Sequence, residues 1–150
     1  MVEKVLAVIP ARHGSKGVKG KNYRDFNNKP LITWTMEIVK SLKYIDYSVI
    51  SSNCKYIQKI ASEKKFNFIK RPQALSSDTS RTEESILHTV NQLKKRNLTF
   101  DYIFIFEPTS PLRKVSTINR AFNFLKKEKI NSLMTVTKID KFIGKIKSNK

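Results

Sequence analysis

Residues 5–22 read VLAVIPARHGSKGVKGKN, a continuous apolar run followed at once by a loop of glycines and cations. A short unbroken apolar run predicts a strand that is buried on both faces of a parallel sheet. The glycines let the backbone of the loop approach a ligand closely, and the Arg and Lys side chains supply positive charge. A strand that opens into such a loop indicates a site for a phosphorylated ligand.

Outward from this strand, the apolar residues alternate between helical and strand-like spacing. Further strands are predicted at residues 47–50, 66–69, 101–106 and 133–136. The intervening helices are predicted from the spacing of Leu31, Trp34, Ile38 and Leu42, of Ile57, Ile60 and Ala61, of Ile86, Leu87, Val90 and Leu93, and of Val115, Ile118, Phe122 and Leu125. This alternation predicts an α/β fold, a three-layer sandwich with a mostly parallel, Rossmann-like sheet.

Two helix starts carry local signals. Ser52 or Asn53 is expected to cap the second helix, and residues 80–83 form a capping box before the third. In parallel sheets of this kind, ligands bind beyond the carboxyl ends of the strands, where the strand order reverses. The loops after Ile9, Ile69 and Phe106 are therefore the candidate binding loops.

Length and composition place the chain among ordinary globular proteins. With 150 residues, 39% of them hydrophobic, we expect a nucleotide-binding α/β domain at residues 1–137 and a Lys-rich end at residues 138–150. The single cysteine, Cys54, excludes an internal disulfide and a cysteine-based zinc site. No signal-type segment and no apolar run of membrane-spanning length is present, so we expect a cytoplasmic protein with no membrane partner.

The net charge of +18 has two interpretations. It is typical of proteins that bind nucleic acid or phosphorylated molecules. However, 23 of the 30 basic residues are lysines spread along the whole chain, as a compositional bias would produce. Nucleic-acid-binding surfaces interleave cations with stacking aromatic residues, whereas most phenylalanines here fall on core positions. A nucleic-acid partner is therefore disfavoured, although a basic nucleic-acid-binding module stays an alternative.

The first loop does not match the common phosphate-binding motifs. A Walker A loop needs four residues between its glycines and a hydroxyl after its lysine. Here five residues separate Gly14 from Gly20, and Asn22 follows Lys21. A solvated, flexible loop would explain the composition alone, but its position after a strand, bracketed by Arg12 and Lys21, favours a polyphosphate site.

Three segments also resemble the acylneuraminate cytidylyltransferases, which include the CMP-sialic acid synthetases and their legionaminic and pseudaminic acid relatives. The first runs from Ile9 to Asn22 and is followed by Asn28-Lys29-Pro30-Leu31-Ile32. The second is Arg71-Pro72 with Leu75 and Ser77-Asp78-Thr79, and the third is Pro108-Thr109-Ser110-Pro111-Leu112-Arg113. Each follows a predicted strand, and together they span most of the chain, to about Val136.

The resemblance implies roles for eleven residues in three groups. Arg12 and Lys21 would act in catalysis by binding the phosphates and the charge of the transition state. The nucleotide would also contact Ser15, Lys16, Asn22, Arg71, Ser80 and Thr82. The sugar would contact Glu107, Thr109 and Ser110. Two positions depart from the family pattern. Arg81 replaces a small residue, which would place it outside the pocket, and Glu107 stands where many relatives carry glutamine.

The resemblance further implies a reaction in which CTP and a nine-carbon 2-keto sugar acid give CMP-sugar and pyrophosphate. Mg²⁺ would assist, but no metal ligands are identified in these residues, and we expect them mainly from a later, missing segment. That segment would also supply the dimer contacts of a homodimeric full-length protein. The chain therefore reads as truncated, with nucleotide affinity but weak or no turnover by itself. A sugar nucleotidyltransferase that uses another nucleotide is the second alternative.

Overall fold

The computed structural model describes residues 3–14, 17–77 and 79–136. The chain divides into two compact units, Met1–Val115 and Ser116–Lys150. The elements of the first unit are, in chain order, β1 (Val5–Pro10), a 3-10 helix (Lys21–Tyr23), β2 (Asp25–Phe26), β3 (Lys29–Pro30), α1 (Leu31–Ser41), β4 (Tyr47–Ser52), α2 (Lys55–Glu63), β5 (Asn67–Lys70), a 3-10 helix (Gln73–Ser76), α3 (Thr82–Lys94) and β6 (Tyr102–Ile105). The second unit holds α4 (Val115–Glu128), which begins at the last residue of the first.

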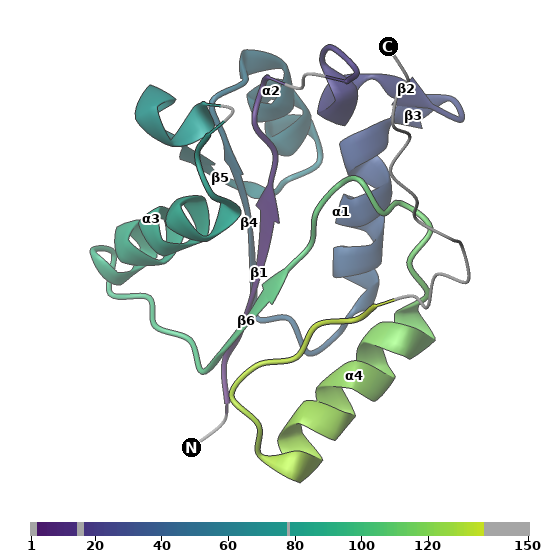
Figure 1. The fold of residues 1–150 in the computed structure, drawn as a ribbon, viewed down its shortest axis with the longest axis vertical. Helices are drawn as coiled ribbons and strands as arrows, with labels where there is room; N and C mark the ends of the chain where they lie inside the picture. Colours follow the sequence, from purple (N-terminus) through teal and green to yellow (C-terminus); the bar gives the residue numbers. More distant parts are fainter. Residues whose placement is uncertain (1–2, 15–16, 78, 137–150) are drawn as a thin grey trace, which may run out of the picture. The chain divides into compact units, whose positions relative to one another are not determined.

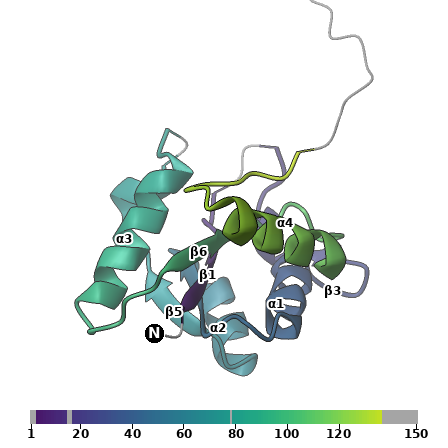
Figure 2. The same cartoon turned by 90° about the horizontal axis from the view of Figure 1, so that it is seen from below.

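The main sheet of the first unit is parallel and has the strand order β5-β4-β1-β6 (Figure 1). From β1 the chain builds outward through β4 and β5, and it then crosses back to place β6 on the other side of β1. Helices α1 and α2 cover one face of the sheet and α3 covers the other (Figure 2). The predicted α/β three-layer architecture is confirmed, and the strand order reverses between β1 and β6.

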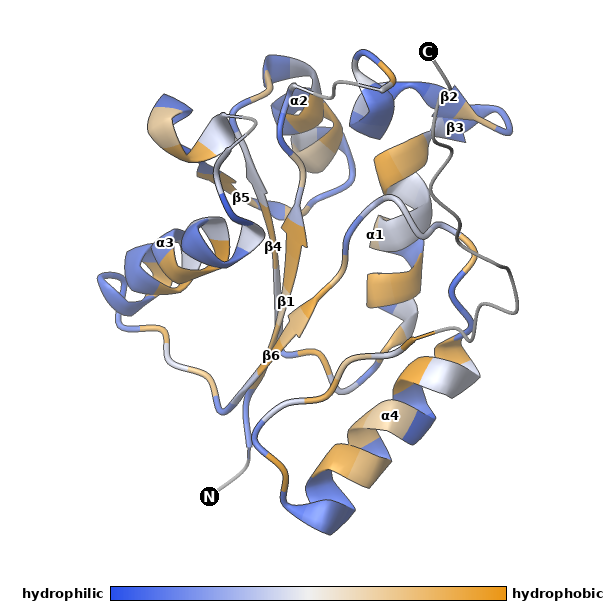
Figure 3. Ribbon diagram, viewed as in Figure 1, coloured by the Kyte–Doolittle hydropathy of each residue, from blue (hydrophilic) through white to orange (hydrophobic). Residues whose placement is uncertain are grey.

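The core of the first unit is centred on β1, where all residues from Val5 to Ile9 are buried. One face of the sheet meets α3 through a cluster of buried side chains, namely Leu6, Val8, Val49, Ile69, Ile86 and Leu93. The hydropathy colouring shows the same concentration of apolar residues on the central strands (Figure 3). Burying each such side chain contributes about 1.5–3 kcal/mol, so this packing stabilises β1, the strand from which the first loop departs.

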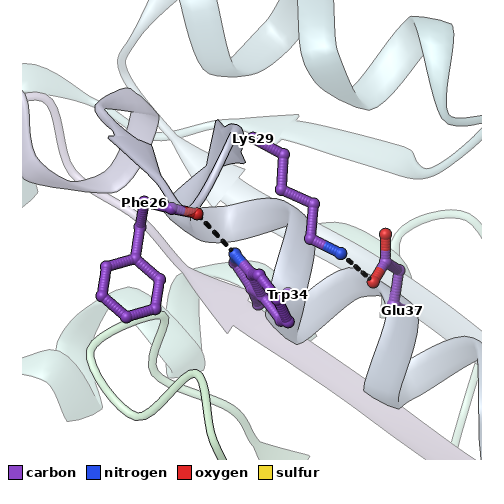
Figure 4. A network of polar contacts seen from close by, with 4 residues as sticks. All are labelled: Phe26, Lys29, Trp34 and Glu37. Atoms are coloured by element: carbon purple, nitrogen blue, oxygen red, sulfur yellow. Dashed lines mark hydrogen bonds and ion pairs between the residues drawn. The ribbon is translucent and has the colours of Figure 1, made fainter.

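A short hairpin precedes α1 and has no counterpart in the predicted elements. Its turn residues Asn27 and Asn28 have φ values of 50° and 65°, the left-handed backbone that a tight two-residue hairpin requires and that asparagine tolerates. Trp34 Nε1 donates a hydrogen bond to the Phe26 carbonyl at 2.9 Å (Figure 4). Lys29 lies 3.7 Å from the centre of the Trp34 ring and pairs with Glu37. These contacts fasten the hairpin to α1.

The inward face of α1 differs from the predicted one. Ile32, Met36 and Val39 are buried, whereas Trp34 from the predicted face is half-buried and contacts the hairpin. The sequence of α1 carries two overlapping apolar stripes. The indole N–H of Trp34 needs an acceptor when it is buried, and the hairpin carbonyl provides one at the periphery.

The predicted helix caps are also wrong in detail. The residue before α2 is Cys54, and Ser52 contributes by accepting a hydrogen bond from the Cys54 N–H at 3.0 Å. The capping contact of α3 is shifted by one residue, because the side chain of Glu84 accepts from the N–H of Arg81 at 3.3 Å. Ser80 therefore lies outside the helix start. Capping patterns in neighbouring frames look alike in sequence, and only the backbone path selects one of them.

Residues 133–136, predicted as a fifth main-sheet strand, form no strand. Met134 and Val136 are 83% and 82% exposed, and among the described residues no strand pairs with them. A short apolar run becomes a strand only where a neighbouring backbone supplies hydrogen bonds, which periodicity cannot show. The Lys-rich end at 138–150 lies outside the described residues. Within the described part of the chain, no helix combines the length and apolarity needed to span a membrane.

Candidate functional site

A cavity of about 260 Å³ opens at the carboxyl ends of β1, β5 and β6. It lies where the strand order reverses, the place at which α/β sheets commonly bind ligands. Its lining residues all belong to the first unit, and they come from the three loops predicted to bind. They are Pro10, Arg12, Gly17, Lys21, Asn22, Arg71, Leu75, Ser80, Arg81, Thr82, Glu107, Pro108 and Thr109.

Two side-chain hydrogen bonds hold the first loop so that Arg12 and Lys21 line this cavity. One guanidinium nitrogen of Arg12 donates to the Ser77 carbonyl at 2.9 Å. The Asn22 side chain is 6% exposed and donates to the Arg12 carbonyl at 3.0 Å. The amide group of Asn22 therefore joins the two ends of the loop, so that the residues bracketing the loop are held at the same cavity.

Arg71 is the most deeply buried cation of the site, with 5% of its surface exposed. Its guanidinium donates to the carbonyl oxygen of Ser51 at 3.0 Å and to the Ser51 hydroxyl at 3.4 Å. Burial, with a smaller contribution from nearby Arg12, lowers the pKa of Arg71 to about 10. The group is still charged at neutral pH, and no carboxylate of the described residues pairs with it. Sequence reasoning expected a residue at a strand end, but not a buried one.

The second loop forms a network of hydroxyl groups beside Arg71. The Ser80 hydroxyl donates to the Ala74 carbonyl at 2.8 Å and lies 2.6 Å from the Ser77 hydroxyl. Arg81, expected outside the pocket, lines the cavity instead. The reason is the frame of the helix start, because α3 begins at Thr82 and Arg81 immediately precedes it in extended conformation. Placing the capping box one residue later in the sequence, with Arg81 in place of Ser80 before the helix, would have predicted this position of Arg81.

The third loop contributes a carboxylate. Glu107 lines the cavity, and the Thr109 hydroxyl donates to its carboxylate at 3.5 Å. Arg113 donates to the Glu107 carbonyl oxygen at 2.6 Å, which fixes the backbone where β6 ends. Burial lowers the pKa of Arg113, and the charge of Glu107 opposes that shift.

The structure thus gathers most of the predicted site residues around one cavity. They are Arg12, Lys21, Asn22, Arg71, Ser80, Thr82, Glu107 and Thr109. Ser110 is exposed and is not among the lining residues; its N–H faces the Glu107 carbonyl at 3.4 Å. Ser15 and Lys16 lie outside the described residues. Apart from Arg81, the lining residues that sequence reasoning missed are mostly apolar or small.

The charges of the lining residues are strongly unequal. Arg12, Lys21, Arg71 and Arg81 face one carboxylate, that of Glu107. Such a concentration of cations at a partly enclosed site favours a ligand with several negative charges. Among the described residues, no group of three or more His, Cys, Asp or Glu side chains is placed to hold a metal ion.

Comparison with known proteins agrees with this description. Residues 6–149 match the family model described as cytidylyltransferase. The CMP-N,N'-diacetyllegionaminic acid synthase of Legionella pneumophila is 34% identical over 119 residues, which are 79% of this chain and 51% of that protein. The N-acylneuraminate cytidylyltransferase of Escherichia coli is 28% identical over 142 residues, covering 94% of this chain and 33% of that protein. The chain spans about half the length of the first relative and about a third of the length of the second.

Solved structures show the same fold at lower sequence identity. A CMP:2-keto-3-deoxy-manno-octonic acid synthetase complexed with CTP superposes with a TM-score of 0.70 and 17% identity, over 85% of this chain and 49% of that one. A 4-diphosphocytidyl-2C-methyl-D-erythritol synthase superposes with a TM-score of 0.62 and 16% identity, over 81% and 54% of the two chains.

Proposed function

The chain belongs to the cytidylyltransferase family, and from that premise we propose that it forms the CTP-binding part of an enzyme that activates a nine-carbon 2-keto sugar acid of the sialic acid type. The cavity supports this proposal most directly, because it concentrates four cations, one of them buried, at the reversal of the strand order. The relatives are named for legionaminic, pseudaminic and N-acylneuraminic acids, which supports the sugar class.

In the proposed reaction, the anomeric hydroxyl of the sugar attacks the α-phosphorus of CTP. A phosphorus–oxygen bond to the sugar forms, the bond to the β-phosphate oxygen breaks, pyrophosphate leaves, and the hydroxyl proton is released. Negative charge grows on the departing pyrophosphate. Arg12 and Lys21 would bind the β- and γ-phosphates and stabilise that charge, because cations fixed before the reaction need no rearrangement as charge develops. Ser15 and Lys16 would contribute further phosphate contacts.

Arg71 would give the nucleotide its strongest electrostatic attraction. A buried cation without a carboxylate partner is costly, and an anion that enters the cavity relieves the cost. Ser80 and Thr82 would contact the base and ribose, with Ser80 placed by its bond to the Ala74 carbonyl. Asn22 would act at the same site chiefly by holding the Arg12 backbone.

Glu107, Thr109 and Ser110 would contact the sugar. The carboxylate of Glu107 repels the acid group of such a substrate, so the acid group would turn toward the cations and Glu107 would accept hydrogen bonds from hydroxyl or amino substituents. This arrangement would favour sugars that carry such donors near Glu107 over sugars with an acceptor there.

Mg²⁺, when bound, would neutralise negative charge on the phosphates. Glu107 is the one carboxylate of the described cavity lining, and Mg²⁺ bound to phosphates usually takes one or two, so Glu107 could supply one metal ligand. We propose that any further metal ligands come from residues beyond those described. A homodimer and a cytoplasmic location belong to the same proposal.

Isothermal titration calorimetry of the purified chain tests the nucleotide assignment. We expect CTP to bind more tightly than UTP or GTP, and we expect Arg12→Ala or Lys21→Ala to weaken CTP binding by at least tenfold, whereas the matched surface variant Lys43→Ala leaves it unchanged. Equal losses in all three variants would indicate a diffuse field of cations instead.

A second measurement separates enzyme from nucleic-acid-binding module. Tight binding of single-stranded RNA with a steep salt dependence, without selectivity for CTP, would contradict the proposal. Pyrophosphate release with CTP, sugar acid and Mg²⁺ measures the proposed reaction directly.

A further inference from the structure

Three aromatic rings are stacked beside the first loop, outside the cavity lining. The ring of Tyr23 lies 5.8 Å from that of His13 at an interplanar angle of 16°, and 5.1 Å from that of Tyr56 at 28°. Tyr23 is therefore held between a residue that follows Arg12 and a residue of α2. Tyr56 forms the outer end of the stack and is 63% exposed.

His13, the other outer ring, is anchored to the start of α2. Its backbone N–H donates to the Asn53 side-chain oxygen at 2.8 Å, and its Nδ1 lies 3.2 Å from the sulfur of Cys54. Both outer rings are thus attached to the first turn of α2 or to the residues just before it. The central ring belongs to the loop itself, in the 3-10 helix that begins at Lys21.

The Tyr23 ring also lies directly against Gly20. A Cβ atom at Gly20 would be 2.5 Å from Cζ of Tyr23, and the φ of Gly20 is 67°. This left-handed turn is the point from which Lys21 departs, and the N–H groups of Tyr23 and Arg24 both donate to the Gly20 carbonyl at 3.0 Å. The ring therefore covers the turn from outside while Lys21 faces the cavity.

We propose that Tyr23 is a positioning residue for the two cations of the first loop. Stacked between His13 and Tyr56, it fixes the turn at Gly20 and the backbone after Arg12, so that Lys21 and Arg12 are held ready for a polyphosphate. Tyr23 itself does not touch the nucleotide. A ring held on both faces loses little further freedom when the ligand binds, so the loop is ordered before binding and the affinity for the ligand rises. This inference rests on the proposed function, since it concerns the affinity for CTP.

The test compares CTP with CMP, which lacks the phosphates that Lys21 would bind. We expect Tyr23→Ala to weaken CTP binding on the order of tenfold and CMP binding less than twofold, as measured by calorimetry well below the unfolding temperature. Tyr23→Phe keeps the ring, so its CTP affinity should stay within twofold of that of the unmodified chain. A merely structural role would lower both affinities together, or neither.

A double-mutant cycle identifies the residue through which Tyr23 acts. In the Lys21→Ala background, Tyr23→Ala should cause a smaller loss than in the unmodified chain, because the part of its effect that is exerted through Lys21 is already absent. Gly20→Ala should weaken CTP binding, because the added Cβ would clash with the Tyr23 ring and would strain the left-handed backbone at this turn. Full additivity of Lys21→Ala and Tyr23→Ala would overturn the inference.

Tyr56→Ala covers the case in which Tyr23→Ala fails to fold. It removes an exposed ring, and we expect a twofold to fivefold loss of CTP affinity with an unchanged unfolding temperature. Leu87→Ala, at a residue that is 62% exposed on α3, is the matched control and should have no effect. If Tyr56→Ala and Tyr23→Ala both bind CTP as tightly as the unmodified chain, the inference about Tyr23 is overturned and the proposed function still stands. If the unmodified chain does not bind CTP, the proposed function is overturned and the inference with it.

Discussion

The guanidinium of Arg71 and the carbonyl oxygen of Ser51 are 3.0 Å apart, and the same carbonyl accepts the N–H of Ala11 at 2.9 Å. One backbone oxygen at the end of β4 thus binds the residue that follows β1 and the residue that follows β5. The contact brings two loops of the cavity to a common point, and it keeps a charged side chain buried without a carboxylate.

Replacing Arg71 by methionine is expected to separate binding from stability. Arg71→Met removes the buried charge but retains a side chain of similar length, and the Ser51 carbonyl keeps its bond from Ala11. The unfolding temperature should stay the same or rise, because exchanging a buried charge for an apolar group is often neutral or stabilising. Affinity for CTP should fall by at least tenfold. A large fall in the unfolding temperature, seen by calorimetry, would show that the charge is needed for folding.

Comparing Arg71→Met with the unmodified chain also gives a prediction for alkaline pH. Burial lowers the pKa of Arg71 from its ordinary value to about 10, so the folded chain holds this proton less tightly than the unfolded chain does. The charge therefore reduces stability at every pH below about 10, and this cost is relieved as the pH rises toward the unfolded value. The stability advantage expected for Arg71→Met should shrink between pH 8 and pH 10.5 in urea unfolding. An advantage that grows over this interval would contradict the assignment.

The surroundings of His88 lead us to expect that the folded chain loses stability in mild acid. Its Nδ1 is buried without a hydrogen-bond partner, and burial, followed by the charges of Arg71 and Lys95, lowers its pKa. Below its ordinary value of 6.5 the unfolded chain takes up the proton first, so folding stability should decrease as the pH falls. His88→Gln should reduce the difference in unfolding temperature between pH 7.5 and pH 5.5. If the two chains lose stability equally over this range, His88 is not the cause.

Removing the charge of Glu107 is expected to strengthen CTP binding, whereas removing the charge of Arg71 is expected to weaken it. Glu107→Gln removes the one carboxylate of the described cavity lining, so CTP binding should tighten by about twofold to fivefold at low ionic strength. The gain should decrease as salt screens the interaction. Glu63→Gln, an exposed change on α2, is the control in the same titration. Weaker CTP binding by Glu107→Gln would show that the carboxylate contributes favourably to nucleotide binding.

Much of the fold could be predicted because burial leaves a direct record in the sequence. The runs that became β1, β4, β5 and β6 are apolar over short lengths, and the glycines and cations follow the strand that ends at Pro10. Where two apolar patterns overlap, as around Trp34, periodicity could not choose the inward face. Residues 133–136 were mistaken for a strand because the pattern contains no information about a pairing partner.

The sequence by itself determined the α/β alternation and the three candidate loops, because these depend on local composition and on the order of the elements. The resemblance of three motifs to a known family indicated most of the residues that line the cavity. The tertiary structure alone decided the burial of Arg71, the entry of Arg81 into the cavity and the stacking of Tyr23 between His13 and Tyr56. Each of these depends on the angle and distance at which separate segments meet, and that geometry is a property of the packed chain rather than of any one stretch of it.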